Sequence, residues 1–190
     1  MYFTNNYEQD LLLMSTLLDG IEFYSGTERK KMLKKVNTKH PKDGGSMLYG
    51  FTWKSYLSPT KNRTKVAEGV YQTKIMDDHP ELMDLFKEFA FLYFPNFEWG
   101  SVQMNKNFQC PPHKDSKNIG ESILVSCGDY IGGKTAVDYG NYKRWYNTRI
   151  APLQFNGSKY THWVEAYTKT RYSLVFFHNR SSRQYKNLLL

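Results

Sequence analysis

Residues 101–177 decide the fold of this chain through five short runs: SVQMN (101–105), SILVSCG (122–128), KTAVDY (134–139), TRIAPLQF (148–155) and RYSLVFF (171–177). Each run is rich in β-branched and aromatic residues, which favour β-strands. Turn residues separate the runs, among them Gly128, Gly132–Gly133 and Asn156–Gly157. Short strands at this spacing are typical of an antiparallel barrel or a double-sheet jelly roll, the cupin fold included.

The first 98 residues are rich in lysine and mostly helical in pattern. One amphipathic helix is predicted over Glu8–Leu18, and a second after Thr27, whose hydroxyl can cap the start of a helix. We therefore expect one α+β domain over residues 1–190. In it, a mostly helical part (1–98) packs on one sheet of a β core (99–180).

The clearest helical pattern is DDHPELMDLFKEFAFLYF (77–94). Its apolar residues recur at i, i+3 and i+4, which predicts one buried face. Asp78 can cap this helix, Pro80 suits its first turn, and Pro95 would end it. We predict a helix that begins near Asp78 and stops before Pro95.

The composition bounds the class of protein. With 190 residues, 40% hydrophobic and 16% aromatic, the chain can bury the core of one domain and is not intrinsically disordered. The formal net charge of +8 favours acidic partners, nucleic acid above all, because lysine and arginine make phosphate contacts. Ordinary solubility charge explains the same balance equally well.

The cysteines and the N-terminus bear on location. Cys110 and Cys127 are too few for a disulfide-rich secreted scaffold, and no Cys/His zinc pattern is present. The first 20 residues lack a basic n-region, and polar residues interrupt their apolar run, so they predict neither a signal peptide nor a membrane span. We expect a soluble cytoplasmic or nuclear protein that is not secreted and has no membrane partner. The oligomeric state is left open.

The segment QCPPHKDSKN (109–118) holds His113 and Asp115 two residues apart. In a strand, residues i and i+2 point the same way, so an imidazole and a carboxylate can converge on one point. Such a pair arises by chance in about one chain in four of this composition. A distant third ligand would complete a face of two histidines and one carboxylate, which leaves three metal positions open and suits non-haem iron(II).

The far end of the chain offers that ligand. His162 lies just before a strand-like run, Arg171 follows nine residues later, and Ser173 comes two residues beyond it. A hairpin would bring Arg171 beside His162, where its guanidinium can grip a carboxylate with two parallel hydrogen bonds. An inward charge before the apolar YSLVFF needs a buried anionic partner. Alternatively, Arg171 is an edge-strand charge and His162 a turn residue.

With H-x-D, a distal histidine and R-x-S in this order, the chain resembles the 2-oxoglutarate/iron(II) dioxygenase superfamily over Gln103–Phe177. The resemblance implies a double-stranded β-helix core. It also implies an enzyme that binds iron(II) and hydroxylates a C–H bond. Such an enzyme consumes 2-oxoglutarate and O2 and releases succinate and CO2. The iron ligands that it implies are His113, Asp115 and His162. It also implies that Arg171 pairs with the far carboxylate of 2-oxoglutarate and that Ser173 assists.

Further motifs narrow the resemblance. AlkB-like members have an N-x-Y that touches the co-substrate; here Asn105 and Asn107 stand at those places, with a shorter gap to His113. The segment HKDSKN followed by GDYIGGKTAV is most similar to the TET/JBP group of nucleobase-oxidising enzymes, in which H-x-D-x-x-N precedes a G-x-Y-x-G-G hairpin. Asn118 matches that asparagine and Tyr130 that tyrosine. We expect Asn105 and Asn118 to contact the co-substrate and Tyr130 the substrate. Plain turn chemistry explains the glycines equally well.

The basic residues suggest a nucleic-acid base as substrate. Seven lysines and arginines lie within Arg29–Lys42, and further basic residues follow at Lys54, Lys61, Arg63 and Lys65. Among them, Phe51, Trp53 and Tyr56 could stack a flipped or single-stranded base. We expect Trp53 and Lys54 to touch the substrate. The alternative is a solvated helix face with core aromatics.

Two other functions stay open. A protein side-chain hydroxylase of the prolyl type would share the metal motif and the spacing from His162 to Arg171, and would need no basic groove. A non-enzymatic cupin-like binding domain would need neither a full ligand set nor Arg171, and the presence of both argues against it.

Overall fold

The computed structural model describes residues 2–25, 43–53, 64–67 and 69–183. The helices are α1 (Tyr7–Asp19), α3 (Lys74–Asp78), α4 (Leu82–Tyr93) and α5 (Arg180–Arg183). The strands are β1 (Gly45–Trp53), β2 (Lys65–Ala67), β3 (Val70–Gln72), β4 (Ser101–Lys106), β5 (Asn118–Cys127), β6 (Ile131–Gly132), β7 (Thr135–Asp138), β8 (Lys143–Tyr146), β9 (Leu153–Phe155), β10 (Thr161–Val164), β11 (Tyr167–Thr168) and β12 (Tyr172–Asn179).

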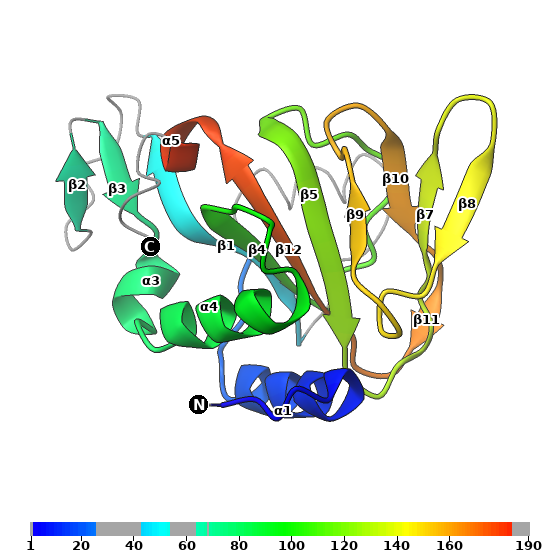
Figure 1. Cartoon of the computed structure of the whole chain (residues 1–190), viewed down its shortest axis with the longest axis horizontal. Coiled ribbons are helices and arrows are strands. Elements are labelled where there is room, and N and C mark those ends of the chain that lie inside the picture. Colours follow the sequence, from blue (N-terminus) through cyan, green and yellow to red (C-terminus); the bar gives the residue numbers. More distant parts are fainter. Residues whose placement is uncertain (1, 26–42, 54–63, 68, 184–190) are drawn as a thin grey trace.

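The strands form two main antiparallel sheets (Figure 1). The large sheet has seven strands in the order β2-β3-β1-β4-β12-β5-β9, and the small sheet has three in the order β10-β7-β8. Strands β11 and β6 form a separate pair. The predicted α+β class is therefore observed, with mostly antiparallel sheets.

Strand β12 lies between β4 and β5 and is buried on both faces. Register pairs Ser173 with Asn105 on one side and with Ser126 on the other. Because side chains alternate along a strand, every second residue of the RYSLVFF run faces the other way. Tyr172, Leu174 and Phe176 belong to the main hydrophobic core, while Ser173, Val175 and Phe177 line a pocket.

Helices α1 and α4 pack on the core face of the large sheet (Figure 1). The prediction over Glu8–Leu18 corresponds to α1, whose first turn is capped by the side chain of Asn6, which accepts a hydrogen bond from the Gln9 amide at 3.2 Å. On α4, Phe86 meets the rings of Tyr49 and Phe176 edge to face, at centroid distances of 5.3 and 5.9 Å. Within the described ranges, no helix combines the length and the apolar character needed to cross a membrane.

The helix predicted to begin near Asp78 begins later. Asp78 ends the short helix α3 and does not cap α4, which starts at Leu82. The reason is Pro80, because a residue before proline is pushed out of the α-helical region. His79 accordingly has φ −136° and ψ 65°, and this breaks the pattern into two helices. The end before Pro95 is as predicted.

The part before residue 99 is less helical than expected, because it supplies three strands to the large sheet. In β1, Met47, Tyr49 and Phe51 are all buried in the core, whereas Leu48 and Thr52 between and after them are only partly buried. This two-residue period is the signature of a half-buried strand, and β1 pairs with β4 across the expected boundary at residue 98. The helix predicted after Thr27 lies outside the described residues.

We predict that Phe86→Ala lowers the free energy of unfolding by about 3–5 kcal/mol, because it removes a fully buried ring between two others. Phe91→Ala on the same helix removes a ring that is 73% exposed and should change stability by less than about 0.5 kcal/mol. Urea denaturation followed by circular dichroism measures both values. Equal effects of the two substitutions would contradict the assignment of the core.

Candidate active site

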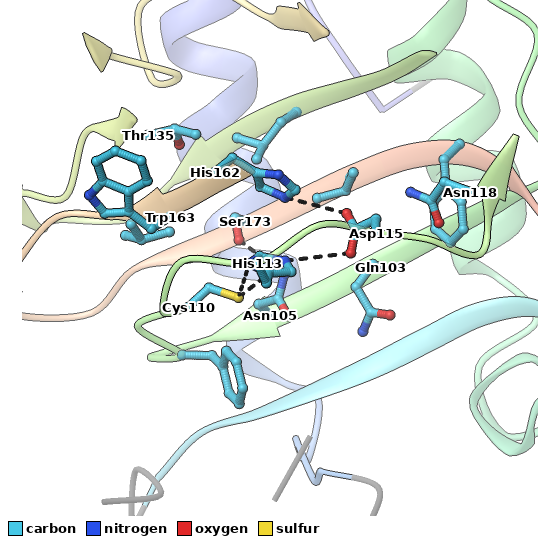
Figure 2. Close-up of a pocket in the computed structure, with 15 residues that line it drawn as sticks. Gln103, Asn105, Cys110, His113, Asp115, Asn118, Thr135, His162, Trp163 and Ser173 are labelled. Carbon is cyan, nitrogen blue, oxygen red and sulfur yellow. Dashed lines mark hydrogen bonds and ion pairs between the residues drawn. The ribbon is translucent and has the colours of Figure 1, made fainter. Parts of the chain in front are cut away.

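A pocket lies between the two sheets, with about 570 Å³ of empty space that is partly open to solvent (Figure 2). Strands β4, β5 and β12 of the large sheet form one wall, and β7 and β10 of the small sheet form another. The predicted site residues that line this pocket are Asn105, His113, Asp115, Asn118, His162 and Ser173. Segments that are far apart in the sequence therefore meet here.

Backbone hydrogen bonds hold the H-x-D segment against β10. The His113 amide donates to the His162 carbonyl at 3.0 Å, and the His162 amide donates to the His113 carbonyl at 2.9 Å. Two residues on, the Asp115 amide donates to the Gly157 carbonyl at 2.9 Å. As a result, one potential ligand atom from each of His113, Asp115 and His162 lies within 4.8 Å of the others.

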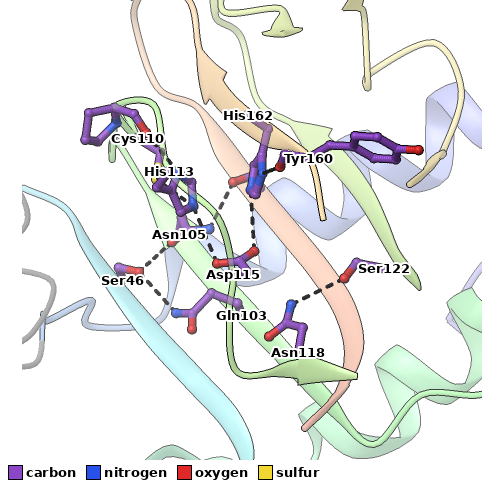
Figure 3. A network of polar contacts seen from close by, with 12 residues as sticks. Ser46, Gln103, Asn105, Cys110, His113, Asp115, Asn118, Ser122, Tyr160 and His162 are labelled. Carbon is purple, nitrogen blue, oxygen red and sulfur yellow. Dashed lines mark hydrogen bonds and ion pairs between the residues drawn. The ribbon is translucent and has the colours of Figure 1, made fainter. Parts of the chain in front are cut away.

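The orientation of both imidazoles is set by main-chain carbonyls (Figure 3). Nδ1 of His113 lies 2.8 Å from the Pro111 carbonyl oxygen, and Nδ1 of His162 lies 3.1 Å from the Tyr160 carbonyl oxygen. A carbonyl can only accept, so Nδ1–H donates, and when the ring is neutral Nε2 carries the lone pair that a metal would take. Each Nε2 lies 3.4 Å from a different oxygen of Asp115. Two nitrogens and a carboxylate thus converge, which is a donor set that fits iron(II).

The electrostatics of this trio favour a cation. Burial alone would raise the pKa of Asp115, but hydrogen bonds from His113 and His162 hold it far below its usual range. Burial alone would lower the pKa of His113, but its hydrogen bonds with Asp115 and Cys110 outweigh this and raise the pKa to about 10. Without a metal, the carboxylate is ionised and keeps a proton on His113. A divalent cation would displace that proton.

Arg171 is a buried cation that immediately precedes β12. It is 2% exposed, and its guanidinium carbon lies 5.2 Å from the ring centroid of Tyr130 and 5.7 Å from that of Tyr167. Its Nε and Nη2 atoms are buried and have no hydrogen-bond partner among the residues that the structure describes. The pKa of Arg171 is lowered by burial, while Tyr130 and Tyr167 act in the opposite direction. A buried guanidinium with unused donors calls for an anionic ligand.

Two features fix the place of Arg171. Its amide donates to the side-chain oxygen of Asn107 at 2.9 Å, and the Asn107 amide donates to the Arg171 carbonyl at 2.8 Å. A Cβ atom on Gly133, where φ is +63°, would stand 3.1 Å from Cδ and Nε of Arg171. The glycine thus serves a close approach as well as a turn.

The predicted hairpin between His162 and Arg171 is wrong. His162 lies on β10 in the small sheet, where β10 pairs with β7, whereas Arg171 precedes β12, which pairs with β4 and β5 in the large sheet. The chain crosses from one sheet to the other through β11. His162 lines the pocket between the two sheets, and so does Ser173, two residues after Arg171.

Hydrogen bonds connect the remaining polar residues of the pocket (Figure 3). The side-chain Nδ2 of Asn105 donates to the Ser173 hydroxyl at 3.2 Å, and the side-chain oxygen of Asn105 accepts from the Ser46 hydroxyl at 2.6 Å. On β5, the Asn118 side chain donates to the Ser122 hydroxyl at 3.3 Å. Asn105 and Ser173 thus form a hydrogen-bonded polar strip in the wall of the pocket.

Of the residues predicted to contact the substrate, those whose side chains the structure describes are buried. Tyr130 is 3% exposed, stacks on Arg171 and shares a hydrogen bond of 2.7 Å with the Ser126 hydroxyl, so it packs against the guanidinium and is not open to a substrate. Phe51 is 1% exposed in the core and cannot stack a base. Lys54, Tyr56 and the basic segment at 29–42 lie outside the described residues, as does the side chain of Trp53.

Three residues that the sequence did not single out lie at the site. Cys110 has its sulfur 3.5 Å from both ring nitrogens of His113, and Gln103 lines the pocket on β4. Tyr167 packs on Arg171. The sequence could have predicted Gln103 as a site residue, because it stands two residues before Asn105 and both side chains face the same way on a strand.

Several solved structures are similar to this chain, while no protein-family model and no curated protein matches it. NgTET1 in complex with 5mC DNA is 18% identical, with a TM-score of 0.49, over 82% of this chain and 67% of that one. A prolyl-4-hydroxylase of Pseudomonas putida is 12% identical, with a TM-score of 0.47, over 94% and 89% of the two chains. A 2OG-Fe(II) oxygenase family protein of Burkholderia pseudomallei is 17% identical, with a TM-score of 0.42, over 60% and 65%. The last of these names is that of the superfamily that the sequence resembles.

We predict that His162→Ala weakens Mn²⁺ binding by more than about 100-fold, because it removes one of three convergent donors. His79→Ala is the matched control. His79 lies in the connection between α3 and α4 and does not line the pocket, and its Nδ1 lies 2.9 Å from a carboxylate oxygen of Glu81. Isothermal titration with Mn²⁺ measures both affinities. Unchanged binding in His162→Ala would exclude this trio as the metal site.

Proposed function

We propose that this chain is an iron(II)- and 2-oxoglutarate-dependent oxygenase that hydroxylates a C–H bond of a nucleic-acid base. The observation that carries the proposal is the buried guanidinium of Arg171, whose Nε and Nη2 have no partner within the described ranges. It lies two residues before Ser173, immediately ahead of β12, and Ser173 lines the pocket that holds His113, Asp115 and His162. A metal trio alone serves many classes of protein. A trio beside a site for a carboxylate suits a dicarboxylic co-substrate.

Each polar residue then has a role. His113, Asp115 and His162 would hold iron(II), with the Nδ1 contacts to carbonyls keeping both rings in place. Arg171 would bind the far carboxylate of 2-oxoglutarate through two N–H donors, and Ser173 would add a hydrogen bond. Asn105 orients the Ser173 hydroxyl.

When bound, iron(II) supplies the oxidising chemistry: one O2 and one 2-oxoglutarate are consumed, the C–H bond becomes C–OH, and succinate and CO2 leave. The protein positions the reactants and limits water around them. Leu124 and Val175 continue the same wall of the pocket beside the polar strip with apolar side chains.

The proposal extends to the architecture. We infer that the large and small sheets together form a double-stranded β-helix core and that residues 1–190 make one dioxygenase domain. The shared pocket between two antiparallel sheets supports this, as does the packing of α1 and α4 on the opposite face of the large sheet.

We predict that Arg171→Lys weakens 2-oxoglutarate binding to the Mn²⁺-loaded protein by about 10- to 150-fold, because lysine keeps the charge but cannot donate two parallel hydrogen bonds. Arg149→Lys is the matched control. Arg149 stacks on Tyr130 at 4.8 Å, as Arg171 does at 5.2 Å, but its Nη1 donates to the carbonyls of Gly128 and Tyr130. Isothermal titration measures both, and equal losses would reject the specific role of Arg171.

Turnover tests the function itself. With iron(II), 2-oxoglutarate and single-stranded DNA or RNA, the chain should release succinate, and mass spectrometry should find nucleosides that have gained one oxygen atom. His113→Ala should abolish both signals. Oxidation of a peptide and of no nucleoside would transfer the reaction to a protein substrate. Absence of succinate, despite intact Mn²⁺ and 2-oxoglutarate binding, would contradict the proposed enzyme.

A further inference from the structure

The outer face of the small sheet carries two tryptophans, of which Trp145 is exposed and Trp163 also borders the pocket. Register places Ala136 between Trp163 on β10 and Trp145 on β8, so all three side chains share one face. Trp145 is 50% exposed, whereas Ala136 beneath the two indoles is fully buried. The solvent face of an antiparallel sheet is normally polar, which makes this row unusual.

This face stands back to back with the metal trio. On β10, His162 is directed toward Asp115, while the indole of Trp163 is directed away from it (Figure 2). The small sheet lies at one end of the molecule, with β8 as its outer strand (Figure 1). A ligand on the outer face would therefore be held one strand's thickness from the proposed reaction.

The two indoles are fixed as a unit. The Nε1–H groups of Trp145 and Trp163 donate to the same oxygen of Glu165, at 3.1 and 2.7 Å. Their edges are thus tied down by hydrogen bonds. A rigid pair of aromatic rings loses little conformational entropy when a flat ligand stacks on it.

Lysines surround this pair. Lys143 lies two residues before Trp145, with Nζ 5.7 Å from the ring centroid of Trp163. Lys134 precedes Ala136 by two residues, so it points to the same face, and Lys114 points away from the pocket because its neighbours His113 and Asp115 point into it. All three lysines are exposed.

The acidic groups of the face are already engaged. Glu165 accepts from both indoles, and Asp138 lies 3.8 Å from Nζ of Lys143 and accepts a hydrogen bond from the Gly140 amide at 2.8 Å. Three lysines against two engaged carboxylates leave the face positive. This matches the chain's net charge of +8 and favours an anionic partner.

Protection of an edge strand accounts for only part of the pattern. Lysine and arginine on β8 would discourage pairing with another strand. That reason does not require the half-exposed indole of Trp145 beside the partly buried Trp163. Aromatic faces beside lysines are the combination that binds single-stranded nucleic acid, because bases stack while cations meet phosphates.

We infer that the outer face of the small sheet, formed by Trp145 and Trp163 with Lys114, Lys134 and Lys143, docks single-stranded nucleic acid. The face holds the strand while the reaction takes place in the pocket on the other side of β10. The inference deepens the proposed function and rests on it for the reaction, but the binding requires neither metal nor co-substrate.

The test is fluorescence anisotropy with a labelled, mixed-sequence single-stranded oligonucleotide and the full chain. Trp145→Ala should weaken binding by about 5- to 150-fold, the loss expected for one stacked base. Trp145→Phe should restore part of it, because a smaller ring still stacks. Phe91→Ala, which removes a 73% exposed ring from α4, is the control and should bind as the unaltered chain does.

Charge is tested on the same strand. Lys143→Ala should reduce the slope of log affinity against log salt by about 0.7, the value for one phosphate contact with a single strand. Arg144→Ala is the matched control, because Arg144 points to the opposite face of β8, toward the ring of Tyr146 at 5.4 Å. The control should leave the slope close to its original value.

Three outcomes would overturn the inference: equal affinities of Trp145→Ala and Phe91→Ala, equal slopes of Lys143→Ala and Arg144→Ala, or binding of an unstructured peptide and of no oligonucleotide. Mn²⁺ and 2-oxoglutarate affinities, measured in the same variants, separate this result from the proposed function. If they stay intact while oligonucleotide binding is absent from the original chain, the docking face fails and the oxygenase stands. If the original chain binds the oligonucleotide but neither Mn²⁺ nor 2-oxoglutarate, the oxygenase is rejected and the docking face stands.

Discussion

Two reciprocal backbone hydrogen bonds between His113 and His162 are the interaction on which the rest of the site depends. They attach the loop after β4 to the small sheet and bring the two ring centroids to 4.2 Å from each other. Asp115 is placed by the same pairing, through its amide and the Gly157 carbonyl. Because main-chain groups set this geometry, the three side chains need little further ordering to act together.

A second constraint is the charge of Arg171 inside the protein. Removing a cation from water costs several kcal/mol, and contact with the rings of Tyr130 and Tyr167 offsets only part of that. The arginine is 2% exposed, and the strand that follows it lies between β4 and β5 and is buried on both faces. The fold thus tolerates a local cost at the place where a ligand can offset it, as functional sites commonly do.

Local patterns predicted much of this structure. The helical period of α1 and α4, the β-prone runs and the i, i+2 relation of His113 and Asp115 each reflect neighbours in the sequence. Features that depend on long-range pairing were not predicted correctly. Strand β1 lies within the part that was expected to be mostly helical, and His162 and Arg171 are not joined by a hairpin. Tyr130, which was expected to contact a substrate, is buried. Which strand lies beside which is decided by the packing of the whole chain, and a short window of sequence does not contain it.

The groups that hold the two imidazole rings are carbonyls of the main chain, at Pro111 and Tyr160. Every amino acid offers the same carbonyl, so the residue types at these two positions can change during evolution while the contacts persist. If the three side chains bind a metal as proposed, a comparison of related sequences would therefore show them as invariant and their supports as variable. In this protein, the groups that orient the histidines depend on the conformation of the backbone, so the residue types at these positions do not reveal them.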